Sequence, residues 1–181
     1  HRLNVDKGRG IAGLSSPLVG RDDELHALQE AVERLRAGIG GIVTLVGDAG
    51  LGKSRLVAEL RKSNNPQSQN LQWFEGRCLS YATHAAYQVW RDMLYVWLDA
   101  AADAAPDAMV NTLQQHVRAV CLEAFGDVYP FLAWLLSLPL DATATARLRG
   151  IDAEGLQVLT FRAVETLLDC AARQTPLILV Y

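Results

Sequence analysis

The sequence predicts an α/β protein with a parallel sheet and a helical insertion between the second and third strands. Apolar, strand-like runs alternate with helical stretches, an order typical of parallel strands joined by crossover helices. A glycine-rich segment joins the first of these runs to a helix, and a long stretch rich in alanine and leucine follows the second. The chain has 181 residues, 50% of them hydrophobic, and is long enough for about one domain with a buried core.

The first part of the chain is expected to lead into this domain. Residues 1–20 are predicted to be a lead-in or linker, because glycine, serine and proline are frequent among them. Residues 21–181 are predicted to form the domain itself. It opens with a helix that begins at Asp22, where apolar residues recur every three or four positions as far as Leu35. Asp22 or Asp23 is suited to cap the first turn of this helix, and a glycine-rich stretch ends it.

The strands and the remaining helices follow from pattern and composition. Residues 42–46 are β-branched or leucine and are bounded by glycines, which predicts a strand buried on both faces. A helix over about 53–61 leads to a second strand over 71–77. A crossover helix over about 152–173 carries an apolar stripe and returns the chain to a third strand at 177–181.

Residues 84–150 are predicted to be the helical insertion, because their pattern is helical almost throughout and too long for one crossover. We expect breaks in this helical pattern near Pro106, Gly126, Pro130, Pro139 and Gly150. One helical face, interpreted as core, carries Trp90, Met93, Leu94 and Trp97. The apolar stretch 128–140 is interpreted as a buried helix, since it is shorter than the about 18 residues that a membrane span needs.

Charge and cysteine content restrict the possible partners and compartment. The net charge of −3 gives no overall positive field, so this segment is not expected to bind nucleic acid directly, and no membrane association is expected. The cysteines, Cys78, Cys121 and Cys170, stand far apart in the sequence and form no C-x-x-C pair. This spacing disfavours a disulfide framework and a zinc site, and it predicts reduced thiols in a cytoplasmic protein.

The glycine-rich segment matches the phosphate-binding pattern G-x-x-x-x-G-K-[ST]. Its eight residues, all predicted to contact nucleotide, are Gly47, Asp48, Ala49, Gly50, Leu51, Gly52, Lys53 and Ser54. It follows a predicted buried strand and opens a helix, which is the context that such a loop requires. Gly47, Gly50 and Gly52 permit backbone torsions that let successive amides turn inward around phosphate oxygens. The sequence therefore predicts a P-loop NTPase fold.

The last two residues of the loop carry the predicted chemistry. Lys53 is the predicted catalytic residue, because its ammonium group can reach the β and γ phosphates, and Ser54 is predicted to offer its hydroxyl to Mg²⁺. Asp48 is expected at the rim of the loop. Hydrolysis also needs a carboxylate that holds Mg²⁺ through water, and in P-loop proteins this acid ends a second hydrophobic strand. Here that strand is the one at 177–181, so the chain is expected to be a fragment truncated there, and Glu75 is the best internal candidate to polarise a water.

Several segments resemble the AAA-type ATPase module of the signal transduction ATPases with numerous domains (STAND). They are residues 17–25 (Pro-Leu-Val-Gly-Arg-Asp-Asp-Glu-Leu), the loop and its flanks at 46–55, residues 76–81 and residues 176–181. In that class the module often follows an adenylate or guanylate cyclase domain, or precedes helical repeats and a DNA-binding domain in large LuxR-type transcription activators. Residues 7–11, Lys-Gly-Arg-Gly-Ile, look more like the cyclase-linked type.

The resemblance implies further contacts and a strand order. Val19 and Gly20 would lie against the adenine, Arg21 would bind the nucleotide or sense its phosphates, and Arg55 would lie beside the loop. The acids of the Walker B strand would follow Tyr181. In the AAA-like order a later strand separates the strands at 42–46 and 177–181, which would pair directly in the kinase and GTPase order. The fragment is therefore expected to leave a gap in its sheet and to be marginally stable, a homo-oligomer, or supported by further chain outside this sequence.

The leading hypothesis is a nucleotide-controlled switch in a multidomain signalling protein. ATP with Mg²⁺ would bind at the loop, and hydrolysis to ADP in the full-length protein would reset an output domain of the same polypeptide. One alternative is a small-molecule kinase that uses residues 84–150 as a substrate lid, although basic residues do not cluster there beyond Arg147 and Arg149. Another alternative is a scaffold that holds nucleotide without turnover.

Overall fold

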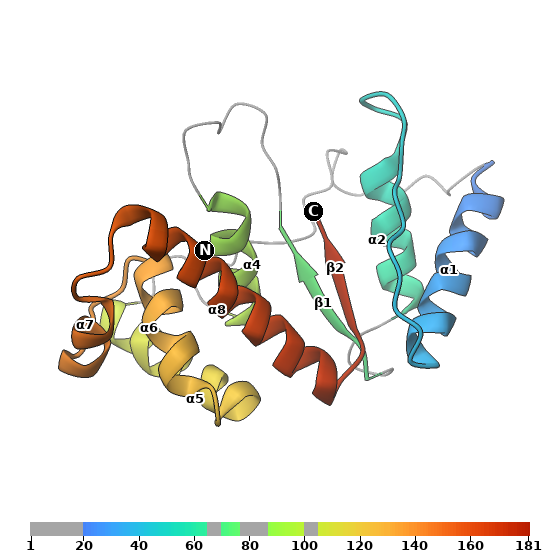
Figure 1. The fold of residues 1–181 in the computed structure, drawn as a ribbon. Helices are drawn as coiled ribbons and strands as arrows, with labels where there is room; N and C mark the ends of the chain where they lie inside the picture. Colours follow the sequence, from blue (N-terminus) through green and yellow to red (C-terminus); the bar gives the residue numbers. More distant parts are fainter. Residues whose placement is uncertain (1–19, 65–69, 77–86, 100–104) are drawn as a thin grey trace. The chain divides into compact units, whose positions relative to one another are not determined.

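The computed structural model describes residues 20–64, 70–76, 87–99 and 105–181 (Figure 1). Its elements are, in chain order, α1 (Asp22–Arg36), α2 (Lys53–Ser63), β1 (Gln72–Glu75), α4 (Gln88–Trp97), α5 (Pro106–Cys121), α6 (Phe125–Leu135), α7 (Ala142–Leu148), α8 (Ala153–Gln174) and β2 (Leu177–Val180). The described residues divide into two compact units, one within residues 4–72 and one within residues 73–181. Each unit is described by itself.

In the unit of residues 4–72, α1 packs against α2. Each helix buries two apolar residues that lie one turn apart, Leu28 and Val32 in α1 and Leu56 and Leu60 in α2. Both predicted helices are confirmed, and α2 continues two residues beyond its predicted end. The capping prediction is wrong, because Arg21 occupies the N-cap position and both predicted aspartates lie within the first turn of α1.

The segment 42–46 is not a strand, and the prediction of a strand buried on both faces is wrong for this chain. Ile42 is 92% exposed and Val46 is 89% exposed. A strand is completed by hydrogen bonds to a neighbouring strand. Among the described residues the sheet consists of β1 and β2. Residues 42–46 thus have the composition of a strand, but no described strand pairs with their backbone.

In the unit of residues 73–181, β1 and β2 lie side by side as a small parallel sheet (Figure 1). The backbone N–H of Gly76 donates to the carbonyl of Val180 at 2.9 Å, which extends the pairing beyond β1. The predicted strands at 71–77 and 177–181 are thus present with shorter bounds. Residue 77 lies outside the described residues.

Gly76 marks a close approach between the end of β1 and α4. A Cβ atom at this position would lie 2.6 Å from Cγ1 of Val89, 2.9 Å from Cγ of Met93 and 3.0 Å from the carbonyl oxygen of Val89. Because one of these atoms belongs to the backbone, rotation of a side chain would not relieve the clash. The absence of a side chain at Gly76 is what allows α4 to lie this close to the strand.

The helices of this unit share one hydrophobic core. Contacts join α5, α6 and α8 to one another, and α7 packs on α6. The largest fully buried side chains are Phe131, Leu113, Leu132, Leu167, Val117, Val128 and Thr160. The predicted apolar face of α4 also contributes to the interior, since Met93 and Leu94 are buried and Trp90 and Trp97 are partly buried. Within the described residues, no helix combines the length and the apolar character that a membrane crossing requires.

One predicted break in the helical pattern is wrong, because Pro130 lies inside α6. A proline within a helix removes one hydrogen bond to the carbonyl four residues earlier and costs about 3 kcal/mol. Here that carbonyl belongs to Gly126, in the first turn of α6. Pro130 is buried together with its neighbours Tyr129 and Phe131, so apolar packing offsets the missing bond.

The predicted crossover helix is confirmed as α8, with bounds shifted by one residue. Asp152 is its N-cap, and the carboxylate of Asp152 accepts a hydrogen bond of 2.8 Å from the backbone N–H of Gly155. This contact satisfies one of the N–H groups that a helix start leaves without an internal partner. At the other end, α8 leads through Thr175 and Pro176 directly into β2.

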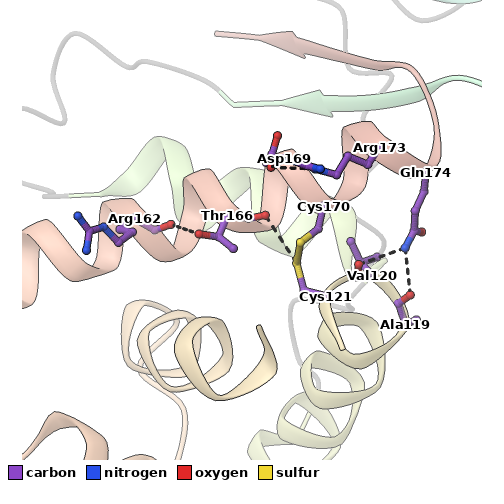
Figure 2. The surroundings of a disulfide bond; sticks show 9 residues. All are labelled: Ala119, Val120, Cys121, Arg162, Thr166, Asp169, Cys170, Arg173 and Gln174. Carbon is purple, nitrogen blue, oxygen red and sulfur yellow. Dashed lines mark hydrogen bonds and ion pairs between the residues drawn. A yellow bond between two sulfur atoms is a disulfide. The ribbon is translucent and has the colours of Figure 1, made fainter. Parts of the chain in front are cut away.

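Cys121 and Cys170 form a disulfide, so the prediction of reduced thiols is wrong for this pair (Figure 2). The two residues are 49 apart in sequence, yet their Cα atoms lie 5.7 Å apart, within the range that a disulfide requires. Packing of α5 on α8 brings the end of one helix to the last turns of the other, and linear spacing does not reveal this proximity. Cys78 lies outside the described residues.

Candidate nucleotide-binding site

Residues 47–54 turn sharply before α2 begins. Gly50 and Gly52 have φ angles of +89° and +80°, where any side chain with a Cβ atom is strained. Gly47 contributes differently, since its φ is not positive and a Cβ there would lie 3.3 Å from Cδ1 of Leu51. Two of the three glycines therefore have the torsional role that the motif predicts, and the third makes room for a neighbouring side chain.

The start of α2 is suited to an anion. Its N-cap is Gly52, which has no side chain to cap the first amides, and its first turn contains no acidic residue. By contrast, the first turn of α1 contains Asp22, Asp23 and Glu24. The first N–H groups of a helix lack internal acceptors and lie at the positive end of the helix dipole. A phosphate at the start of α2 would thus meet the N–H groups of the first turn without repulsion from a carboxylate in that turn.

Lys53 lies across the loop that precedes it. Its Nζ atom donates hydrogen bonds of 2.7 Å to the carbonyl of Gly47 and 2.9 Å to the carbonyl of Asp48. The ammonium group is therefore held by neutral oxygens of the loop. Phosphate oxygens are stronger acceptors for an ammonium group than neutral carbonyls, because they carry negative charge and pair with the ammonium as ions.

Arg21 approaches the same loop from the start of α1. Its Nη2 atom donates to the carbonyl of Leu51 at 3.2 Å, and its Nη1 atom donates to Oε1 of Glu24 at 2.6 Å. Two cationic side chains, Lys53 and Arg21, thus both hold carbonyl oxygens of the loop. Gly20, beside Arg21, is exposed and has a φ of +68°, and Val19 lies outside the described residues.

The remaining predicted site residues lie at the surface of the loop and of α2 or, in one case, in β1. The side chains of Asp48, Ala49, Ser54 and Arg55 are all exposed. Glu75 is the last residue of β1 and is half-buried in the other unit. The assigned roles of these residues stay predictions. Sequence reasoning missed Glu24, although its position three residues after Arg21 at a helix start is a signal for an ion pair.

The contact with Arg21 changes the acidity of Glu24. The hydrogen bond from the Arg21 guanidinium lowers the pKa of Glu24 below its ordinary 4.5, assisted by a backbone hydrogen bond and by the arginine charge, and opposed by partial desolvation. The side chains of Arg21 and Glu24 are 39% and 43% exposed, so solvent screens the pair. The ion pair thus holds the Arg21 side chain beside the loop and contributes little to folding stability.

This contact predicts a pH dependence at the loop. Because the pKa of Glu24 is lower in the folded chain than in the unfolded one, the ion pair contributes its stability above pH 4.5 and loses it as the pH falls through the lowered pKa. A titration of the Glu24 carboxyl carbon by NMR should give a midpoint below the ordinary value. In an Arg21→Ala variant the midpoint should move back up, and an unchanged midpoint would contradict the contact.

Comparison with known proteins settles the family. A sequence model of the family described as "AAA ATPase domain" matches residues 17–181. The chain belongs to the AAA ATPase domain family. The family assignment implies a P-loop NTPase and a nucleotide-binding ATPase module, in agreement with the loop and helix described above.

Two further comparisons give less information about this AAA ATPase domain. Over 75 residues it is 33% identical to an uncharacterized protein of Rhizobium meliloti (strain 1021), and the match covers 41% of this chain and 7% of that protein. The chain thus spans a small part of the length of that relative. No solved structure matches the chain.

Proposed function

We propose that this AAA ATPase domain is the nucleotide-controlled switch of a multidomain signalling protein of the STAND class. ATP with Mg²⁺ binds at residues 47–54, and hydrolysis to ADP resets an output domain of the same polypeptide. The observation that carries the proposal is the loop itself: residues 47–54 lead into α2, and Lys53 and Arg21 both lie on the carbonyl oxygens of that loop. Two cations at one helix start match the several negative charges of a triphosphate.

The proposed roles follow from this arrangement. Lys53 transfers its hydrogen bonds from loop carbonyls to the β and γ phosphates and acts as the catalytic cation. Arg21 adds a second positive charge from α1, with Glu24 holding one of its nitrogen atoms. Gly20, and Val19 before it, contact the adenine, and Arg55 lies at the edge of the loop. When bound, Mg²⁺ neutralises phosphate charge, and Ser54 is the residue of this chain that would hold it.

The output domain and the assembly are also part of the proposal. A nucleotide cyclase or a DNA-binding region with helical repeats is the kind of output that the STAND class suggests. The exposed apolar segment 42–46 is suited to pair with an added strand. We propose that this strand is supplied by the same polypeptide or by a second copy of the chain. Comparing the mass of the protein in solution with and without ATP would test whether a second copy of the chain supplies the strand.

The serine of the loop gives the first test of the proposal. In a Ser54→Ala variant, Mg²⁺ should no longer strengthen ATP binding, and we expect about a tenfold loss of affinity in the presence of the metal because one ligand is missing. Calorimetry with ATP, with and without Mg²⁺, measures this directly. The matched control is Ser63→Ala, at the other end of α2, whose hydroxyl donates to the carbonyl of Glu59.

The same preparation separates the switch from the two alternatives. Equal responses of the Ser54 and Ser63 variants to Mg²⁺ would contradict a metal–nucleotide site at this loop. Release of phosphate from ATP by the full-length protein favours the switch over a scaffold that holds nucleotide without turnover. Transfer of the γ phosphate to an added metabolite, detected by mass spectrometry, would instead identify a small-molecule kinase.

A further inference from the structure

The ends of α5 and α8 are joined by more than packing (Figure 2). Besides the disulfide between Cys121 and Cys170, the side-chain amide of Gln174 donates to the carbonyls of Ala119 at 3.3 Å and Val120 at 3.1 Å. The last carbonyls of a helix have no partner within the helix, so Gln174 serves as a cap for α5. One covalent bond and two hydrogen bonds thus hold the two helix ends together.

The two cysteines of the disulfide differ in exposure to solvent. Cys121 is 2% exposed, whereas Cys170 is half-buried. We therefore expect an external thiol to attack the sulfur of Cys170 rather than that of the buried Cys121. Attack at this sulfur would form a mixed disulfide on Cys170 and release Cys121 as the buried thiol.

The surroundings of Cys121 also suit the reduced state. Its Sγ atom lies 3.6 Å from the carbonyl oxygen of Thr166, which a free S–H group can use as an acceptor. The hydroxyl of Thr166 donates to the carbonyl of Arg162 at 2.8 Å and does not compete for this oxygen. The site can therefore hold either the disulfide or the buried thiol without leaving a polar group unpaired.

The position of this pair connects it to the sheet. Cys170 lies in the last turns of α8, and the chain passes from there through residues 175 and 176 into β2. β2 pairs with the end of β1 through the bond from Gly76 to Val180. Whatever fixes the end of α8 also fixes the start of β2.

We propose that Cys121 and Cys170 form a reversible thiol–disulfide site that locks the end of α8 and the start of β2 when oxidised. On oxidation the two thiols give two protons and two electrons to a low-molecular-weight disulfide such as that of glutathione, which leaves as two thiols. Reduction reverses this exchange through the mixed disulfide on Cys170. The proposal that this site regulates the domain rests on the proposed function. A protein that uses cellular ATP is exposed to thiol buffers such as glutathione, and disulfides under these conditions are characteristically redox-sensing.

The first experiment asks whether the pair responds to a thiol buffer. The full chain with Cys78→Ser, so that these two thiols alone react, is equilibrated in buffers of different ratios of glutathione to its disulfide. Free thiols are then trapped with a maleimide and counted by mass. Both thiols should disappear together as the disulfide form of glutathione increases. Failure to form the bond in the most oxidising buffer, or survival of the bond in excess reduced glutathione, would overturn the proposal.

The second experiment asks whether the bond controls the sheet. Hydrogen exchange at the amides of β2 should be at least tenfold faster in the reduced chain, and its Tm should be lower by about 10 °C for a closed loop of this length. The Cys170→Ser variant should match the reduced chain and be insensitive to glutathione. Equal exchange rates at β2 in both states would overturn the coupling. Measuring ATP binding in the same buffers tests the proposed function separately. If neither the oxidised nor the reduced chain binds ATP, the proposed function is wrong, but the result of the thiol titration still stands.

Discussion

Replacement of Lys53 by alanine is expected to weaken ATP binding by about 10- to 100-fold. The ammonium group lies on the carbonyls of Gly47 and Asp48 at the start of α2, where the phosphates are proposed to bind. A hydrogen bond to a charged group contributes about 1.5 to 3 kcal/mol, which corresponds to that range of affinity. Calorimetry with Mg-ATP measures the change, and the unfolding temperature shows whether the fold is retained.

The matched control is Lys62→Ala, which removes a lysine from the other end of the same helix. Lys62 forms a 3.3 Å ion pair with Glu59 on the surface of α2. An exposed pair of this kind contributes about 0 to 1 kcal/mol to stability, and ATP affinity should stay unchanged. Equal losses of affinity in the two variants would mean that general charge, rather than the loop, attracts the nucleotide, and the site would be wrongly assigned.

Truncation of Phe131 to alanine is expected to destabilise the helical core by about 3 to 5 kcal/mol. Phe131 is the largest of the fully buried side chains, and it lies in α6, which contacts α5, α7 and α8. Its loss leaves a cavity that the surrounding helices fill incompletely, so Tm should fall by about 10 °C or more. Thermal unfolding followed by circular dichroism at helical wavelengths gives the shift.

Leu122→Ala provides the comparison for this core substitution. Leu122 directly follows α5 and is 71% exposed, so its truncation removes little buried surface and should change stability by about 0.5 kcal/mol or less. A Phe131→Ala protein that unfolds at the same temperature as the Leu122→Ala protein would contradict the packing of α6 described above.

The helices could be predicted from the sequence because the information that specifies them is local. An apolar stripe predicts α8 within a residue at each end, and in the structure the carboxylate of Asp152 caps its first turn. The loop could also be predicted, since Gly50, Gly52 and Lys53 are adjacent in the chain and their torsions and contacts depend on near neighbours.

The errors concern features that depend on distant residues. The composition of residues 42–46 is that of a strand, but a strand also needs a second backbone beside it, and composition does not supply one. Cys121 and Cys170 have no pairing signal in their spacing, because packing of two helices brings them together. Pro130 was expected to interrupt a helix, yet burial among aromatic neighbours compensates for the lost hydrogen bond.

The contact at Gly76 has a mechanical consequence. Side-chain atoms of Val89 and Met93 and the carbonyl oxygen of Val89 lie within 3.0 Å of the place where a β-carbon would stand, so α4 and the end of β1 touch without a side chain of Gly76 between them. A shift of α4 along its axis must therefore push on the strand or open a gap beneath it. Gly76 in turn holds β2 through its N–H group, so force applied to α4 would reach both strands through the main chain.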